Sequence, residues 1–201
     1  MKLTVTTNLT VDGVMQGLGG ADEDRRGGFE RGGWVIPLVD PEAGAHIDEV
    51  YGGATAFLFG RRTYEIFAGS WGAIADMKVT PIGAALDSRP KYLASTTITT
   101  PQWAGTTVLS GDIGAAVREL KAQTGGELLV PGSGVLVRWL LANGLVDQLD
   151  LITYPVIVGQ GTRLFAESGP DIALDLVSSR TTSRGITIQA YRPAGRPKYA
   201  T

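Results

Sequence analysis

The chain has 201 residues, 43% of them hydrophobic and 19% charged, which is typical of one globular domain and unlike a disordered segment. It holds no cysteine and a single histidine, which excludes disulfides, thiolate zinc sites and cysteine nucleophiles and argues against any metal site. Its formal net charge of -2 offers no general attraction for nucleic acid or for an anionic membrane.

The first ten residues, MKLTVTTNLT, alternate polar and apolar side chains. A secretory signal has a charged stretch followed by a longer apolar one, so this pattern does not indicate one. No apolar run approaches the roughly 20 residues that a membrane span needs. We therefore expect a cytoplasmic protein with no membrane partner.

The first third of the chain predicts a strand at Lys2–Asn8, then a turn. The segment Gly17–Gly33 is dense in glycine and charge, which predicts a long surface loop rather than a core element. A short helix is expected at Ala43–Tyr51 and a buried strand at Ala54–Phe59. Long loops in compact domains are usually functional or disordered.

Strands then alternate with helices, as in a parallel sheet. The expected elements are a helix at Thr63–Ala68, strands at Lys91–Ser95 and Thr106–Leu109, a helix at Asp112–Gln123, a strand at Glu127–Val130 and a helix at Val135–Ala142.

The last third predicts one more strand within Asp147–Val158, interrupted by Pro155, and a hairpin of Ile172–Arg180 with Ile186–Tyr191. No linker or repeat divides the chain. We therefore predict a single α/β domain over residues 1–201, with a mostly parallel central sheet flanked by helices and an antiparallel hairpin at the carboxyl end.

Three turns that follow strands are rich in glycine or hydroxyl residues, and backbone N–H groups at helix starts bind phosphate oxygens. Gly60 is followed by Arg61, Arg62 and Thr63, which predicts a phosphate clamp. Alternatively, Gly60 only makes the turn and Thr63 only caps the helix.

The other two turns are weaker signals. Ser95 and Thr96 could hold a ribose or its phosphate, or merely form a turn. At Gly132, Ser133 and Gly134 a pyrophosphate could approach the backbone closely, although the spacing matches neither a P-loop nor GxGxxG.

Few residues suit acid–base work. His46 stands at an expected helix start, where a solvated or capping role is the more common one. The acidic run Asp22–Asp24 is typical of a solvated loop face rather than of a metal site. Trp34 follows the long loop and could stack on a planar ring of a substrate.

Taken together, FLFGRRTYEIF, PKYLAST, LLVPGSGVLVRWLLANGLVDQLDL and PVIVGQGTRLF resemble the dihydrofolate reductase family. The similarity is greater to the branch that contains the carboxy-terminal reductase domain of bacterial riboflavin biosynthesis proteins. TNLTVDGVMQG matches that family's first strand and loop start, and the resemblance implies that Asp12 of this segment lies near the substrate.

The resemblance implies NADPH as hydride donor and a planar nitrogen heterocycle as acceptor, as in a 5-amino-6-(5-phosphoribosylamino)uracil reductase or a dihydrofolate reductase. By position it implies that the first turn holds cofactor phosphates, that the second lies near the adenosine ribose, and that the third faces the pyrophosphate and nicotinamide. In the family the third turn has a cis peptide between two glycines, where this chain has Gly132 and Ser133.

One departure concerns the carboxylate that protonates folate, which should lie on the helix before FLFG. Near that point the chain has Gly44, Ala45 and His46, which argues against folate reduction. Glu42, Asp48 and Asp24 are the other candidates for proton donation or substrate contact. Water could also supply the proton.

The leading interpretation is an NADPH-dependent reductase of a small molecule, with Gly17–Gly33 as a lid. A second interpretation is a nucleotide- or drug-binding module that kept the fold without turnover. A third is a structural homodimer joined through the apolar segment Tyr154–Val158.

Overall fold

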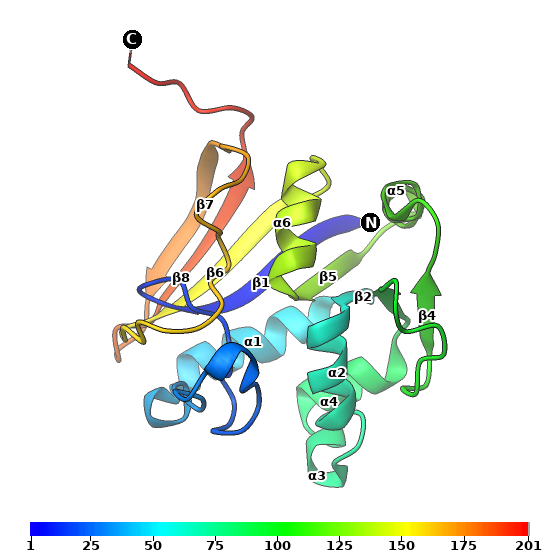
Figure 1. Ribbon diagram of the computed structural model, residues 1–201, viewed down its shortest axis with the longest axis horizontal. Coiled ribbons are helices and arrows are strands. Elements are labelled where there is room, and N and C mark those ends of the chain that lie inside the picture. The colour runs from blue at the N-terminus through cyan, green and yellow to red at the C-terminus, as the bar shows by residue number, and fades with distance from the viewer. Residues whose placement is uncertain (201) are drawn as a thin grey trace.

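The computed structural model describes residues 1–200, and its strands form one eight-stranded sheet with the order β4-β3-β2-β5-β1-β6-β8-β7 (Figure 1). The strands are β1 (Lys2–Thr10), β2 (Ala56–Gly60), β3 (Lys91–Ala94), β4 (Thr106–Leu109), β5 (Glu127–Gly132), β6 (Gln148–Tyr154), β7 (Leu174–Thr181) and β8 (Thr187–Pro193). The α-helices are α1 (Pro41–Gly53), α2 (Arg61–Gly69), α3 (Ala75–Lys78), α4 (Pro81–Ser88), α5 (Ile113–Ala122) and α6 (Gly134–Ala142). Two single 3-10 turns lie at Arg26–Gly28 and Ile36–Leu38.

The sheet is parallel from β4 through β6 and antiparallel at its other edge. Each crossover between parallel neighbours carries a helix or a long segment, whereas β7 and β8 are joined by a tight turn. The α/β class, the mostly parallel sheet and the antiparallel hairpin predicted from the sequence are confirmed.

Helices cover both faces of the sheet, and strand alternation decides which residues they meet (Figure 1). Leu58 of β2 packs with the buried residues of α5 and α6, while Phe57 and Phe59 pack on the other face with residues of α1, α2 and α4. All five residues of β2 are buried, as expected for a central strand with both faces covered.

The amino end of α5 shows how local sequence sets an element. The Asp112 carboxylate accepts a hydrogen bond from Ala115 N–H at 3.0 Å, and Val117 and Leu120 are buried on one face. A capping aspartate before apolar residues at helical spacing is an ordinary start for an amphipathic helix.

The structure also differs from the expectations in three places. Helices α3 and α4 were not predicted, although Thr80 caps α4 by accepting from Gly83 N–H at 3.1 Å. The strand expected within Asp147–Val158 with an interruption at Pro155 does not resume after it and ends at Tyr154, because Pro155 has no N–H for the ladder. The long loop was expected to lie outside the core, yet Phe29 is only 1% exposed.

The sheet opens between β1 and β5, and this opening positions the site. The two strands pair from Lys2 with Glu127 to Val5 with Val130. Beyond that point β1 continues to Thr10 against β6 alone, while β5 turns toward α6. No helix within residues 1–200 is long and apolar enough to cross a membrane.

Candidate active site

The three glycine- or hydroxyl-rich turns lie at one edge of the sheet. Phe59 of β2 is in register with Gly132 of β5, and Gly60 is in register with Ala94 of β3. Because these strands are parallel, their carboxyl ends are level and the turns that follow them are neighbours. Arg61 reaches across by donating from Nη1 to Thr97 Oγ1 at 3.4 Å.

Two of these turns are in direct contact. A Cβ placed on Gly60 would lie 3.0 Å from the Ser133 backbone nitrogen and would overlap the Ser133 hydroxyl. Gly132 has φ of 150°, and its Cβ would lie 2.6 Å from Thr63 Oγ1. The peptide between Gly132 and Ser133 is cis, as the resemblance implies for the two glycines of the family. At Gly60 and Gly132 the space that a Cβ would need is taken by the Ser133 and Thr63 hydroxyls, so the two turns form one closely packed cradle of backbone and hydroxyl groups.

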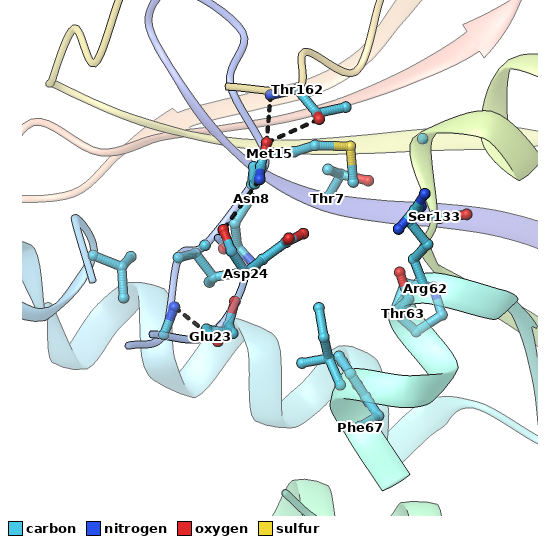
Figure 2. Close-up of a pocket in the computed structure, with 18 of the residues that line it drawn as sticks. Thr7, Asn8, Met15, Glu23, Asp24, Arg62, Thr63, Phe67, Ser133 and Thr162 are labelled. Atoms are coloured by element: carbon cyan, nitrogen blue, oxygen red, sulfur yellow. Dashed lines mark hydrogen bonds between the residues drawn. The ribbon is translucent and has the colours of Figure 1, made fainter. Parts of the chain in front are cut away.

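A cavity of about 780 Å³ lies beside this cradle, where β1 and β5 separate. Thr63, Ser133 and Gly134 line one side of the cavity. Thr7 and Asn8 of β1 line it from the sheet (Figure 2). Thr7 is only 2% exposed, and neither its Oγ1 nor Asn8 Oδ1 has a hydrogen-bond partner among residues 1–200. Buried polar atoms without partners are rare and indicate a place where a polar ligand group would be satisfied.

The wall opposite β1 is apolar. It is built by Ile47 and Tyr51 of α1, by Ile66 and Phe67 of α2, and by Trp71 after α2. Phe67 and Trp71 pack with ring centroids 4.7 Å apart. Aromatic and aliphatic side chains of this kind suit the planar ring of a ligand, because the contact removes apolar surface of both the wall and the ring from water.

Gln16 fixes the long loop over the cavity. Its Nε2 donates to the carbonyls of Asp24 at 3.1 Å and Arg26 at 2.9 Å. Its Oε1 accepts from the Thr162 backbone N–H and from Thr162 Oγ1, both at 2.9 Å. One buried amide therefore joins the loop to the segment after β6, and Figure 2 shows the two bonds from Thr162 beside the cavity.

Two carboxylates of the loop, Glu23 and Asp24, line the cavity. Burial raises the pKa of Glu23, and an N–H bond from Gly19 at 3.0 Å offsets only part of this effect. Burial also acts to raise the pKa of Asp24, but hydrogen bonds from Arg26 outweigh it and hold that pKa below its usual range. The two neighbours are therefore shifted in opposite directions.

Some of the residues expected to hold a cofactor line the cavity, and the others lie in the turns beside it. Thr63, Ser133 and Gly134 line it. The remaining members lie in the same three turns, outside the cavity lining: Gly60, Arg61, Ser95, Thr96 and Gly132.

The three candidate acid–base residues of α1 do not line the cavity. The stripe that faces inward is Ala43, Ile47 and Tyr51, spaced by four residues, and it holds no carboxylate. Glu42, His46 and Asp48 stand one position from this stripe and so point elsewhere.

Two of those residues have contacts away from the cavity. Glu42 accepts from the Ser183 backbone N–H at 3.1 Å and from its hydroxyl at 2.9 Å, in the turn between β7 and β8. Burial lowers the pKa of His46, and the nearby Arg180 adds to the effect. The Glu42 bonds tie α1 to the hairpin.

Asp12 and Trp34, expected near a substrate, also lie outside the cavity lining. Asp12 accepts from Val158 N–H at 3.1 Å and from Gly159 N–H at 2.8 Å. Trp34 is 7% exposed, donates from Nε1 to the Gln16 carbonyl at 2.8 Å, and packs edge-on against Tyr154. Asp24 is the one expected substrate residue that lines the cavity.

Sequence reasoning missed much of the cavity lining, including the polar residues Thr7, Asn8, Gln16 and Glu23. The TTN run places three polar residues in succession and breaks the alternation of the first strand, which was a signal for the first two, because a buried strand rarely carries unpaired polar side chains. For Gln16 and Glu23 no periodicity exists, since both belong to irregular segments.

Comparisons with known proteins agree with this geometry. The family model described as the RibD C-terminal domain matches residues 1–188. A curated protein of Bacillus subtilis (strain 168), the uncharacterized protein YyaP, is 25% identical in an alignment 195 residues long that covers 94% of each chain.

Solved structures share the fold. A candidate riboflavin biosynthesis protein from Shewanella sp. PV-4 superposes with a TM-score of 0.72 at 20% identity, covering 96% of this chain and 99% of that one. The dihydrofolate reductase of Enterococcus faecalis, complexed with NADP(H) and RAB-propyl, gives a TM-score of 0.61 at 13% identity and covers 96% of each chain. The dihydrofolate-reductase-like fold expected from the sequence is confirmed.

Proposed function

The chain belongs to the RibD C-terminal domain family, and on that premise we propose that it is an NADPH-dependent reductase that transfers a hydride to a small heterocyclic molecule. Family and fold support a reductase role. The observation that carries the proposal is the backbone cradle formed by the turns after β2 and β5, which opens into one deep cavity.

The residues of the cradle fit a phosphorylated dinucleotide. Backbone N–H groups at the starts of α2 and α6 suit phosphate oxygens, and Arg61 and Thr63 add charge and a hydroxyl. Ser95 and Thr96 lie at the next strand end, where an adenosine ribose and its phosphate would reach. The unpartnered Thr7 Oγ1 and Asn8 Oδ1 offer polar contacts at the ring end. When bound, NADPH supplies the hydride and its two electrons.

The protein's own residues position the reactants and exclude water. The apolar wall of Ile47, Tyr51 and Phe67 holds a planar substrate against the cofactor end of the cavity. The loop Gly17–Gly33 acts as a lid, with Gln16 as its anchor. Because α1 presents no carboxylate to the cavity, we propose water as the source of the proton.

The test is NADPH consumption, followed through the nicotinamide absorbance across a panel of pyrimidine, pterin and carbonyl compounds. Steady turnover of at least one compound is expected, with a rate that saturates in NADPH. Failure of NADPH to bind at all would end the proposal.

The missing carboxylate on α1 favours one alternative, a nucleotide- or drug-binding module without turnover. Stoichiometric ligand binding with no NADPH oxidation across the panel would support it, and steady turnover would remove it. A cytoplasmic location and a homodimer through Tyr154–Val158 stay predictions, and size-exclusion chromatography tests the second.

A further inference from the structure

The two ends of the cavity differ in charge. Figure 2 shows Glu23 and Asp24 across the cavity from Thr63 and Ser133, which belong to the turns of the cradle. If NADPH occupies the cradle, the substrate must occupy the end that carries the two carboxylates. The charges at this end decide which substrates it accepts.

A phosphorylated substrate needs a cation at that end, and the arginine there is already engaged. Arg26 donates from Nε to Asp24 Oδ1 at 2.6 Å and forms a second bond to the other carboxylate oxygen. The Asp24 side chain is only 7% exposed, so the carboxylate of this bidentate pair is shielded from water, whereas the Arg26 side chain is 40% exposed. Breaking it to bind phosphate would leave a buried carboxylate without a partner.

The other arginine of the lining belongs to the cofactor end. Arg62 is the second residue of α2 and adjoins Thr63 in the cradle. No other lysine or arginine lines the cavity within the described part of the chain. A phosphate at the substrate end would therefore face Glu23 and Asp24 without a free cation.

Glu23, unlike Asp24, is not paired with an arginine among the described residues. It is partly buried, it accepts a hydrogen bond from Gly19 N–H at 3.0 Å, and it forms no ion pair within residues 1–200. Apolar side chains, among them Leu18, Val35 and Ile47, line the cavity near this loop and α1. A carboxylate beside apolar walls binds a flat apolar group that carries N–H donors.

We propose that the substrate end takes a planar, apolar molecule with an amidine- or amine-type N–H donor and no phosphate, and that Glu23 is the residue that contacts this donor. The inference rests on the proposed function, because it takes NADPH to fill the cradle. A substrate without phosphate would distinguish this chain from a reductase that acts on phosphoribosyl pyrimidines.

The test uses the complex with NADPH and three probes of similar size and different charge: benzamidine, benzamide and phenyl phosphate. Calorimetry should show benzamidine binding at least about tenfold more tightly than phenyl phosphate, with benzamide between them. Equal or tighter binding of phenyl phosphate would overturn the proposal. Since NADPH binding is measured first, its absence would count against the proposed function and not be confused with this outcome.

Two loop variants with the same loss of charge assign the effect to one residue. Glu23→Gln should weaken benzamidine roughly tenfold and leave phenyl phosphate unchanged or slightly improved. Asp22→Asn, at an exposed residue outside the cavity lining, should leave both unchanged. NADPH affinity should be the same in both variants. An unchanged affinity for benzamidine in Glu23→Gln would refute the role of Glu23, and the probe ranking on the unmodified protein tests the substrate class without any variant.

Discussion

Ser133 lies against Gly60 so closely that no side chain fits between the turn after β2 and the turn after β5. The contact follows from the register of the parallel strands β2 and β5, in which Phe59 is paired with Gly132. It keeps backbone N–H groups of two helix starts within one cradle. The proposed cofactor site depends on this relationship.

Replacing Gly60 by alanine should therefore damage both stability and cofactor binding. The new Cβ would overlap the Ser133 hydroxyl and push the two turns apart. We expect a loss of about 1–3 kcal/mol in the free energy of unfolding and weaker NADPH binding. Gly44→Ala is the matched control, because a Cβ there meets nothing within 4 Å and α1 gains helix propensity. Thermal unfolding and a cofactor titration of both variants check this, and equal behaviour would contradict it.

Arg61→Ala should weaken NADPH more than NADH. Arg61 points from the start of α2 toward Thr97, beside the turn that we assign to the adenosine ribose and its phosphate. Loss of one charge-assisted contact to the 2′-phosphate corresponds to a roughly tenfold decrease in affinity for NADPH. The check is a pair of titrations, with Arg192→Ala on β8 as the control. Equal losses for the two cofactors would argue against a role at the 2′-phosphate.

Gln16→Ala should loosen the lid. The variant leaves carbonyls of Asp24 and Arg26 and the N–H of Thr162 without their partner, at a cost of about 1–3 kcal/mol. We expect faster proteolysis and faster hydrogen exchange within Gly17–Gly33, together with a lower kcat. An exchange rate in the loop that equals that of the unmodified protein would contradict the anchoring role.

Stability at acid pH should report on Asp12. Burial alone would raise the pKa of this carboxyl, but hydrogen bonds from Thr10, Val158 and Gly159 outweigh it and lower the pKa from 3.8 to about 2. A carboxyl with a lowered pKa stabilises the fold above its unfolded pKa, and this contribution is lost as the pH falls through the folded value.

Asp12→Asn should thus be less stable than the unmodified protein at neutral pH, and the difference should shrink as the pH falls from about 4 to about 2. Denaturant unfolding at several pH values measures it. Asp175→Asn, at an exposed position on β7, is the control. A difference that stays constant over this range would show that Asp12 does not contribute through its charge.

The sequence predicts most of the strands and helices because hydrophobic alternation and glycine turns are local signals. The register of Phe59 with Gly132 is not local, so the convergence of the turns follows only from the parallel order of the sheet. Helix α4 was missed because Gly83 and a short apolar stretch hide its periodicity, although Thr80 and Pro81 are an ordinary helix start.

The candidate site was harder to predict because some of its polar side chains, such as Gln16 and Glu23, come from irregular segments. A helix shifts direction by about 100° per residue, so Glu42, His46 and Asp48 lie off the inward stripe of α1 although they adjoin it. Trp34 was expected to face a ligand, but its indole N–H is satisfied by the Gln16 carbonyl inside the core. The position of Glu23 depends on how the loop folds over the cavity, which no spacing in the sequence encodes.

The most direct measurement is a calorimetric titration of the protein with NADPH. The account predicts saturable binding of one cofactor per chain, weakened in Gly60→Ala and unchanged in Gly44→Ala. No detectable binding at millimolar NADPH, or binding that is indifferent to Gly60→Ala, would contradict a cofactor site in the cradle.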